Sequence, residues 1–225
     1  MRKLPRKYRE IYENFYIDYS QANTFFRKLS LFVEKWYHLK AYKAKTDSHS
    51  ILEIGAGNLN HVKFEKNFKI YDVVEPKDYL IKASDPVMRK RVRNVYKDIE
   101  NIPEGFIYDK IISIAVLEHI ENLELILEKI SKKLCDNGKF IVEIPAEGEF
   151  LWWLGWRLTT GIGFWLKYRL DYGVIMRFEH VNKASKIIAS LKNYFNIVHL
   201  NSFPLNFKNW RLYIHIVLTK KEIIW

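Results

Sequence analysis

The sequence predicts an α/β fold, built on a doubly wound, mostly parallel sheet with helices on both faces. From about residue 50 onward, short apolar runs alternate with polar, helix-like segments, which is the pattern of parallel strands with right-handed crossovers. The runs are rich in Ile and Val and do not alternate strictly, as is typical of strands buried on both faces. Two further runs near the end of the chain are joined by a short loop, which favours an antiparallel pair.

Seven strands are expected in all, with a helix between the fourth and the fifth. That helix covers Glu121–Leu134, where Leu and Ile recur at intervals of three and four, as on an amphipathic helix. The first strand is expected to lead through a glycine turn into another helix. The expected strands are Ile51–Gly55, Phe68–Pro76, a weak run around Val95, Asp109–Val116, Gly138–Pro145, Tyr194–Asn201 and Arg211–Lys220.

Composition narrows the classes of partner. The net charge is +11, which suits an anionic membrane surface, a phosphorylated substrate or only a compositional bias. A dense run of about 5 to 8 basic residues is missing from the sequence, so we do not expect a nucleic-acid partner. A single cysteine, Cys135, excludes an internal disulfide and fits a reducing, cytoplasmic setting. We expect neither a secretory signal nor a membrane span.

The stretch Ile51–Val62, ILEIGAGNLNHV, contains the glycine turn. Gly55 and Gly57 allow positive backbone angles and close approach of a ligand, but Asn60 stands where a dinucleotide-binding loop would have its third glycine. The carboxylate of Glu53 would repel a pyrophosphate and attract a ligand that carries an ammonium group. S-adenosylmethionine is such a ligand. The alternative is a plain turn with a surface acid.

Two further acids follow later strands. Glu75 ends the second strand, twenty positions after Gly55, where a carboxylate can accept hydrogen bonds from ribose hydroxyls. Asp98 follows the weak third strand, where a carboxylate can reach the adenine amino group. The segment after the fourth strand, SIAVLEHIENL, would lie across the sheet from the glycine turn, beside the reacting end of the cofactor.

These motifs together resemble the class I S-adenosylmethionine-dependent methyltransferases. The similar segments are LEIGAGNLN, VVEP, KDIENIP, YDKIISIAVLEHIENL and NGKFIVEIP, and AVLEHI resembles the branch that methylates small molecules. The resemblance implies a Rossmann-like seven-stranded sheet with an antiparallel C-terminal strand. It also implies that Gly55, Ala56 and Gly57 line the methionine and ribose, Glu53 neighbours the amino acid end, Glu75 holds the ribose, Asp98 and Ile99 flank the adenine, and Ala115 and Val116 border the cofactor.

A single methyltransferase domain is the economical organisation. Its expected parts are an N-terminal helical cap (1–49) of two helices that break near Asp18–Asn23, a cofactor-binding half (50–145), a substrate-recognition insertion (146–192) and a C-terminal strand pair (193–225).

Methyl transfer is an in-line displacement, for which alignment of acceptor, methyl and sulfur supplies much of the rate. A hydroxyl acceptor also benefits from a base with a pKa near neutrality, and the candidates are His180 and His119. Structural alternatives are a helix-start residue for His119 and, for His180, a position beside a helix whose N-cap is Asn182. We expect no metal site, because the spacing of the ligand-type residues suggests none.

The insertion after the fifth strand is rich in aromatic and cationic residues. Its tryptophans could stack on a substrate, pack as a lid over the cofactor, or lie on a membrane surface. The candidate substrate-binding residues are Glu147, Arg157, Arg169, Tyr172 and Glu179.

The sequence therefore predicts an S-adenosylmethionine-dependent O-methyltransferase that acts on a small, anionic molecule. The segment from EIPAEGEF to EHVN resembles methyltransferases of bacterial surface-glycan biosynthesis, which implies a phosphorylated or nucleotide-linked sugar or another capsule or surface-polysaccharide precursor as the acceptor. The alternatives are an RNA methyltransferase and a non-catalytic protein that binds S-adenosylmethionine. The oligomeric state is left open.

Overall fold

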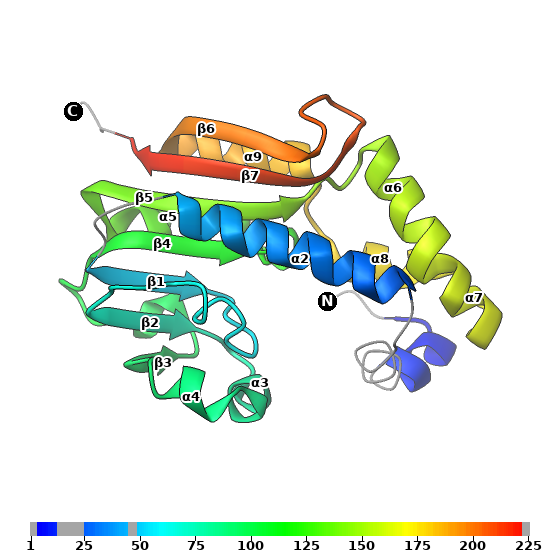
Figure 1. Ribbon diagram of the computed structural model, residues 1–225, viewed down its shortest axis with the longest axis horizontal. Coiled ribbons are helices and arrows are strands. Elements are labelled where there is room, and N and C mark those ends of the chain that lie inside the picture. The colour runs from blue at the N-terminus through cyan, green and yellow to red at the C-terminus, as the bar shows by residue number, and fades with distance from the viewer. Residues whose placement is uncertain (1–3, 13–24, 45–48, 222–225) are drawn as a thin grey trace.

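A computed structural model describes residues 4–12, 25–44 and 49–221. It contains a seven-stranded sheet in the order β3-β2-β1-β4-β5-β7-β6 (Figure 1). Strands β1 to β5 are parallel, which confirms the predicted parallel sheet, and the last two strands pair antiparallel, also as predicted. Strand β7 lies between β5 and β6 and is antiparallel to both. The strands are β1 (Ser50–Ile54), β2 (Ile70–Val74), β3 (Asn94–Tyr96), β4 (Tyr108–Ile114), β5 (Leu134–Pro145), β6 (Phe195–Pro204) and β7 (Arg211–Lys220).

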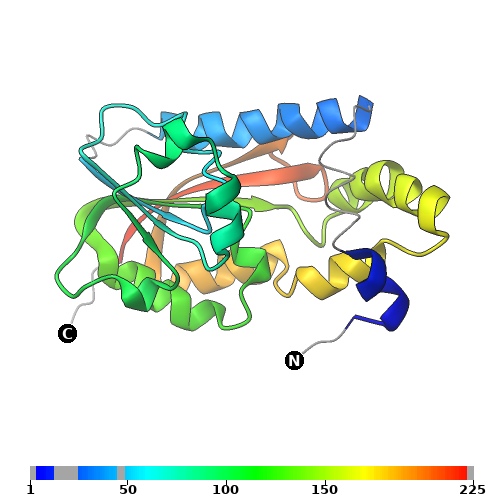
Figure 2. The ribbon, with the colours of Figure 1, turned by 90° about the horizontal axis from the view of Figure 1, so that it is seen from below.

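Helices cover both faces of the sheet (Figure 2). Successive side chains of a strand point to opposite faces, so in β1 Leu52 packs into the core on the side of α5 (Leu123–Lys133) and α9 (Ala184–Tyr194). Ile51 points the other way, into the core beneath α2 (Phe25–Lys43). The short helices α3 (Asp78–Ala83), α4 (Pro86–Arg89), η1 (Ile99–Asn101) and η2 (Leu117–His119) lie in the connections.

The prediction of a helix directly after the first strand is wrong. Residues 57–64 form successive turns, and Leu59 has a φ of +64°, which a right-handed helix does not accommodate. His61 of these turns and Glu65, which follows them, face inward: His61 Nε2 lies 3.0 Å from Glu65 Oε1, and Lys110 Nζ of β4 donates to the same oxygen at 2.6 Å. The residue after the turns is thus the partner of a buried lysine, while α2 covers this face of the sheet.

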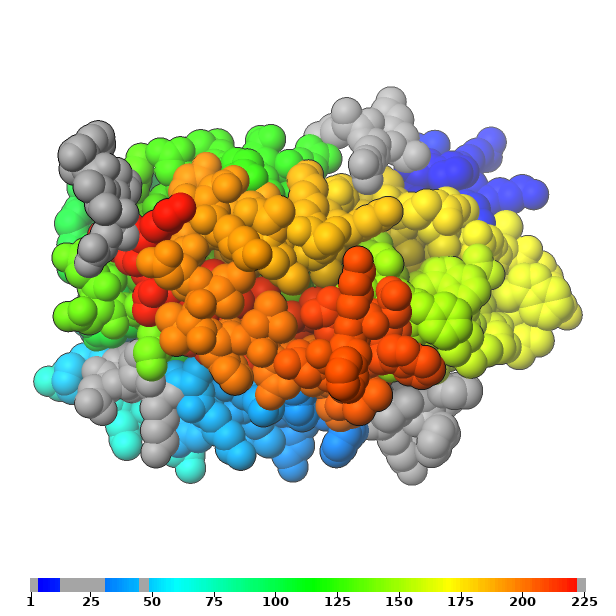
Figure 3. Space-filling model, turned by 90° about the horizontal axis from the view of Figure 1, so that it is seen from above, coloured from blue at the N-terminus to red at the C-terminus, as the bar shows by residue number. Residues whose placement is uncertain are grey.

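The insertion lies beyond the carboxyl ends of the parallel strands (Figure 1). It consists of α6 (Phe150–Trp156), the π-helical turn η3 (Arg157–Gly161), α7 (Ile162–Tyr168) and α8 (Gly173–Glu179). The last part of the predicted insertion, residues 184–192, instead belongs to α9, which packs against the sheet. The connection between β6 and β7 lies beside it (Figure 3), since Leu151 N donates to Asn209 O at 2.9 Å. Helical residues 6–12 pack against α7 and α8, and the predicted break at Asp18–Asn23 is outside the described residues.

Within the described parts of the chain, no helix is both long enough and apolar enough to cross a membrane.

Candidate functional site

The glycine turn closely follows the end of β1. Gly55 and Gly57 both have positive φ, +70° and +53°. A Cβ at Gly55 would lie 2.3 Å from Cγ2 of Val116, so glycine is required where the first and fourth strands end side by side. A Cβ at Gly57 would meet no atom within 4 Å. The backbone at Gly57 is therefore open to a ligand on that side.

Glu75 and the glycine turn are joined directly. Glu75 Oε2 accepts a hydrogen bond from Gly57 N at 2.8 Å, and Oε1 accepts one from Lys77 N at 3.0 Å. The carboxylate is 5% exposed and is held in one orientation at the end of β2. Two residues assigned to the same ligand from the sequence thus lie in contact.

Glu53 lies beneath the turn and not on the surface, which removes the alternative of a plain surface acid. Its carboxyl is 3% exposed and accepts a hydrogen bond from Tyr71 OH at 2.7 Å. Burial raises the pKa of Glu53 to about 8, the Tyr71 hydrogen bond opposes this, and the charges of Glu65 and Glu75 add to it. A cationic group above the turn would favour its ionised form.

The remaining predicted cofactor residues lie at the same edge of the sheet. Asp98 precedes η1 and caps it by accepting from Glu100 N at 3.0 Å, with an exposed side chain, while Ile99 is buried. Ala115, with φ +53°, donates its N–H to Glu143 O at 2.8 Å and leads into Val116. All nine candidates thus follow or end strands β1 to β4, and parallel strands bring these ends together.

Two segments far apart in the sequence form the second part of the site. Val181 N and Asn182 N donate to Glu118 O at 2.8 and 3.1 Å. The Asn182 amide donates to Leu117 O at 3.0 Å and to Ile120 O at 2.6 Å. Asn182 is therefore not the N-cap of α9, and the structural alternative for His180, which placed the cap there, is wrong. It ties the end of α8 to the loop after β4.

This tie brings the two predicted histidines together. The rings of His119 and His180 meet edge to face, with centroids 4.8 Å apart. His180 Nδ1 lies 2.5 Å from Glu147 Oε2, and His119 Nδ1 lies 3.0 Å from Glu179 O. The partner of His119 is sixty residues away, so the alternative of a purely local helix-start role does not hold.

Charges around the pair shift its pKa values in opposite directions. Burial lowers the pKa of His180, but the hydrogen bond to Glu147 and the charges of Glu118, Glu147 and Glu179 outweigh burial, so this pKa is raised. Burial and the charge of His180 lower the pKa of His119. Burial raises the pKa of Glu118 to about 7.

Glu118 is a site residue that sequence reasoning missed. It is 2% exposed, and its Oε1 lies 3.9 Å from His119 Nε2. One ligand-type atom from each of Glu118, His119 and His180 lies within 4.8 Å of the others. The sequence shows Glu118 next to His119 after the fourth strand, but its spacing does not indicate that His180 lies beside them in the folded chain. The absence of a metal site therefore cannot be argued from the spacing of the ligand-type residues.

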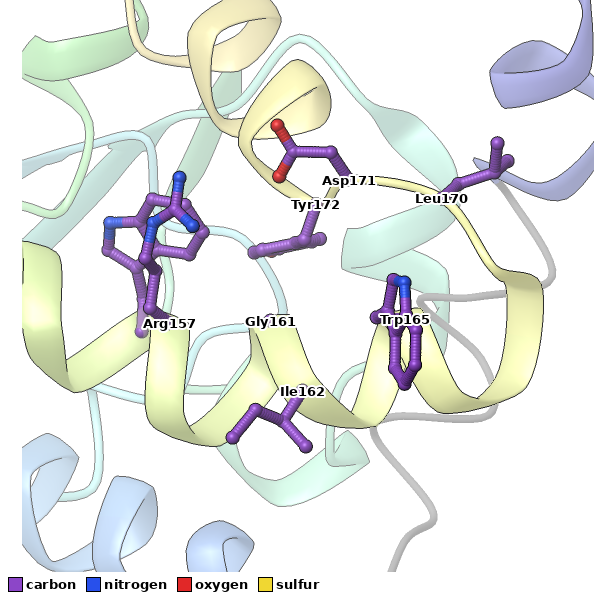
Figure 4. Close-up of a pocket in the computed structure, with 8 residues that line it drawn as sticks. Arg157, Gly161, Ile162, Trp165, Leu170, Asp171 and Tyr172 are labelled. Carbon is purple, nitrogen blue, oxygen red and sulfur yellow. The ribbon is translucent and has the colours of Figure 1, made fainter.

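Two hollows in the insertion contain other predicted residues. A cavity of about 470 Å³ is lined by Glu147, Arg157, Arg177 and Lys183, among others. A second, of about 320 Å³, lies between α7 and the segment before α8, where Trp165 and Tyr172 face each other across it (Figure 4). Arg157 lines both and stacks over Trp153 and Trp156. Arg169 stacks over Trp165 and lines neither cavity, and the Glu179 side chain accepts from Tyr12 OH.

Comparisons with known proteins agree with this architecture. Residues 25–176 match a family model described as a methyltransferase domain. The (S)-coclaurine N-methyltransferase of Papaver somniferum is 30% identical over 104 residues, covering 43% of this chain and 30% of that protein. Pavine N-methyltransferase of Thalictrum flavum subsp. glaucum is 26% identical over 104 residues, covering 43% of this chain and 29% of that protein. The matched segment is thus less than a third of the length of these curated relatives.

Solved structures share the fold over nearly the whole chain. The N-methyltransferase NodS from Bradyrhizobium japonicum, in complex with S-adenosyl-L-homocysteine, superposes with a TM-score of 0.64 at 14% identity, covering 97% of this chain and 100% of that chain. The chain therefore belongs to the S-adenosylmethionine-dependent methyltransferases of class I, the family that its motifs resemble.

Proposed function

We propose that this chain transfers the methyl group of S-adenosylmethionine to a hydroxyl oxygen of a small, anionic acceptor. The observation that carries the proposal is the cluster of Glu118, His119 and His180 beside the carboxyl end of β4, next to the glycine turn. A hydroxyl must lose its proton as it attacks the methyl carbon, and an imidazole held by a carboxylate can assist that loss. Glu147 and His180 form such a pair at 2.5 Å.

The cofactor side of the proposal rests on the turn between β1 and the segment that follows. The open backbone at Gly57, the fixed carboxylate of Glu75 and the buried acid Glu53 suit the methionine and ribose of the cofactor. Val116 touches the same turn and precedes the residues of the cluster. Because Val116 links the glycine turn to the cluster along the chain, we place the methyl group of the bound cofactor on the side of the cluster.

The acceptor side rests on the larger cavity. It adjoins the cluster through Glu147, and its lining includes the cations Arg157, Arg177 and Lys183. Such cations favour an acceptor that carries phosphate, because charge-assisted hydrogen bonds to phosphate are strong. A phosphorylated or nucleotide-linked sugar, of the kind used to build surface polysaccharides, meets these requirements.

A second candidate is transfer to an amine nitrogen. The curated relatives and NodS are named as N-methyltransferases. Carboxylates of Glu118 and Glu147 lie beside the histidines and would attract an ammonium group. A phosphorylated amino sugar would present both groups to the same site, so it belongs among the acceptors to be tested.

The test is methyl incorporation from labelled S-adenosylmethionine into nucleotide-linked sugars, sugar phosphates, amino-sugar phosphates and RNA. We expect label in a phosphorylated sugar, at oxygen, and its loss in His180→Gln and His119→Gln. His49→Gln is the matched control, because His49 is exposed and contacts its neighbours through its backbone.

Label at nitrogen would favour the second candidate, an N-methyltransferase. Label in RNA alone would mean that the chain is an RNA methyltransferase and that the proposal is wrong. If S-adenosyl-L-homocysteine binds but no acceptor gains label, the chain is a non-catalytic binding protein and the proposal is wrong.

A further inference from the structure

The buried carboxylate of Glu118 is only partly accounted for by the protein around it. Its side chain is 2% exposed, and Oε2 has no hydrogen-bond partner among the described residues. Burial of a carboxylate without a compensating partner costs several kcal/mol in proteins. The nearest cationic candidates are imidazoles, and His119 Nε2 is still 3.9 Å from Oε1. That distance is too long for a hydrogen bond, so His119 does not satisfy the buried carboxyl.

One ring nitrogen of each histidine lies within 4.8 Å of a carboxyl oxygen of Glu118. Nδ1 of His119 is within hydrogen-bond distance of a carbonyl, Glu179 O at 3.0 Å, so it must carry the proton. Nδ1 of His180 faces the carboxylate of Glu147 at 2.5 Å. In the neutral rings the lone pair is then on Nε2. A histidine that ligates a metal is usually held in this way, by a carbonyl or carboxylate at its other nitrogen.

The distances suit a small cation. The three ligand atoms lie within 4.8 Å of one another, so an ion at their centre would be at most about 2.8 Å from each. Side-chain shifts below about 1 Å would reach the ~2.0–2.2 Å typical of bonds from imidazole and carboxylate to such metals. The backbone bonds from residues 181 and 182 to Glu118 O hold the two segments in register.

We propose that Glu118, His119 and His180 bind a divalent transition-metal cation. Two imidazoles and one carboxylate are ligands for cations of the zinc, cobalt, iron and manganese type, while magnesium prefers oxygen ligands alone. Three protein ligands leave coordination positions for a further molecule. His119 is 43% exposed, so the site is open on that side.

What the cation does rests on the proposed function, but its binding does not. A hydroxyl of the acceptor that coordinates the cation loses its proton to solvent more easily, because the cation stabilises the alkoxide. The alkoxide oxygen attacks the methyl carbon, the carbon–oxygen bond forms, and the carbon–sulfur bond breaks with its electron pair left on sulfur. His119 and His180 are then ligands, and the activation of the hydroxyl belongs to the cation.

The test uses the full chain without a histidine tag, treated with a chelator and dialysed, and titrated with Co²⁺ alone. We expect one equivalent of Co²⁺ to bind, with the visible absorption of a nitrogen- and oxygen-ligated site. Glu118→Gln, His119→Gln and His180→Gln should each weaken binding at least tenfold. His49→Gln should bind as the native chain does, and S-adenosyl-L-homocysteine binding shows that each variant is folded.

Absence of stoichiometric Co²⁺ binding to the native chain, or binding that the three variants leave unchanged, would overturn the inference. Methylation that persists after chelation would remove the catalytic role of the cation and leave the proposed function standing. Co²⁺ binding without methylation of any acceptor would leave the metal site standing and contradict the proposed function.

Discussion

The two parts of the site are built in different ways. At the cofactor edge, the backbone sets the shape: Gly55 and Gly57 turn the chain, and Glu75 binds an N–H of the turn. On the acceptor side, His119 and His180 come from two distant loops, and the side chain of Asn182 helps to hold these loops together. The first part is therefore sensitive to an added methyl group, and the second to the loss of a single polar atom.

The largest effect is expected from Gly55→Ala. The new Cβ would lie 2.3 Å from Val116 at a positive φ, so we expect a loss of about 3 kcal/mol in unfolding free energy from overpacking and backbone strain together. The displaced turn should also lose S-adenosyl-L-homocysteine binding, at least a hundredfold by calorimetry. Urea unfolding gives the stability.

Gly105→Ala is the matched control, since Gly105 has φ +82° and open space around it. It should show the backbone strain alone, about 1 kcal/mol. Equal losses in the two variants would mean that contact with Val116 is not what requires glycine in the turn.

The next effect is expected in the pH dependence of the unfolding free energy, and its source is Glu53. Its folded pKa, about 8, is above that of an unfolded carboxyl, so the folded chain holds a proton that the unfolded chain has lost. The stability from this proton is complete below the unfolded pKa and is lost as pH rises through the folded pKa.

Relative to Glu53→Gln, the native chain should thus lose up to about 1.4 kcal/mol per pH unit between about pH 5 and 8. Urea unfolding of both proteins across this range measures the difference. Parallel pH profiles would show that the buried carboxyl is already ionised in the folded chain.

Glu147→Gln should have an intermediate effect. Loss of the carboxylate that holds His180 Nδ1 should reduce the methylation rate about 10- to 100-fold, as for other residues that orient a functional histidine. The affinity for S-adenosyl-L-homocysteine should not change, because Glu147 is not at the cofactor edge. The double variant with His180→Gln should be no slower than His180→Gln alone, and additive losses would mean that the two residues act separately.

The smallest effect is expected from Trp165→Ala in the second hollow (Figure 4). The side chain is 51% exposed, so stability should change little. If the acceptor extends from the cluster past Arg157, its KM should rise several-fold with kcat unchanged. Leu125→Ala, an exposed position on α5, is the control, and an unchanged KM would confine the acceptor to the cavity beside Glu147.

The cofactor edge could be predicted from the sequence because its parts are local. Each of Gly55, Glu75 and Ala115 is at or next to a strand end, and a parallel sheet places such ends together. The short connection before β7 also predicted the antiparallel pairing of β6 and β7. The absence of a helix after β1 could not be predicted, because the periodicity shows neither the positive φ of Leu59 nor the buried pairing of Glu65 with Lys110.

The acceptor side could be predicted only in part. His119 and His180 were recognised one by one from their positions after strands and in the insertion. Their meeting, and the involvement of Glu118, depend on hydrogen bonds between loops sixty residues apart. Sequence spacing carries no signal for such long-range contacts, so the cluster became visible only in the folded chain.

The central claim is that the cofactor lies on the glycine turn with its sulfur toward the histidine cluster. The most direct measurement is a titration of isotope-labelled protein with S-adenosyl-L-homocysteine, followed by amide NMR spectra. The amides of Gly55, Gly57, Val116 and His119 should shift together and saturate with one affinity. Saturation elsewhere on the molecule, with these four amides unmoved, would contradict the account.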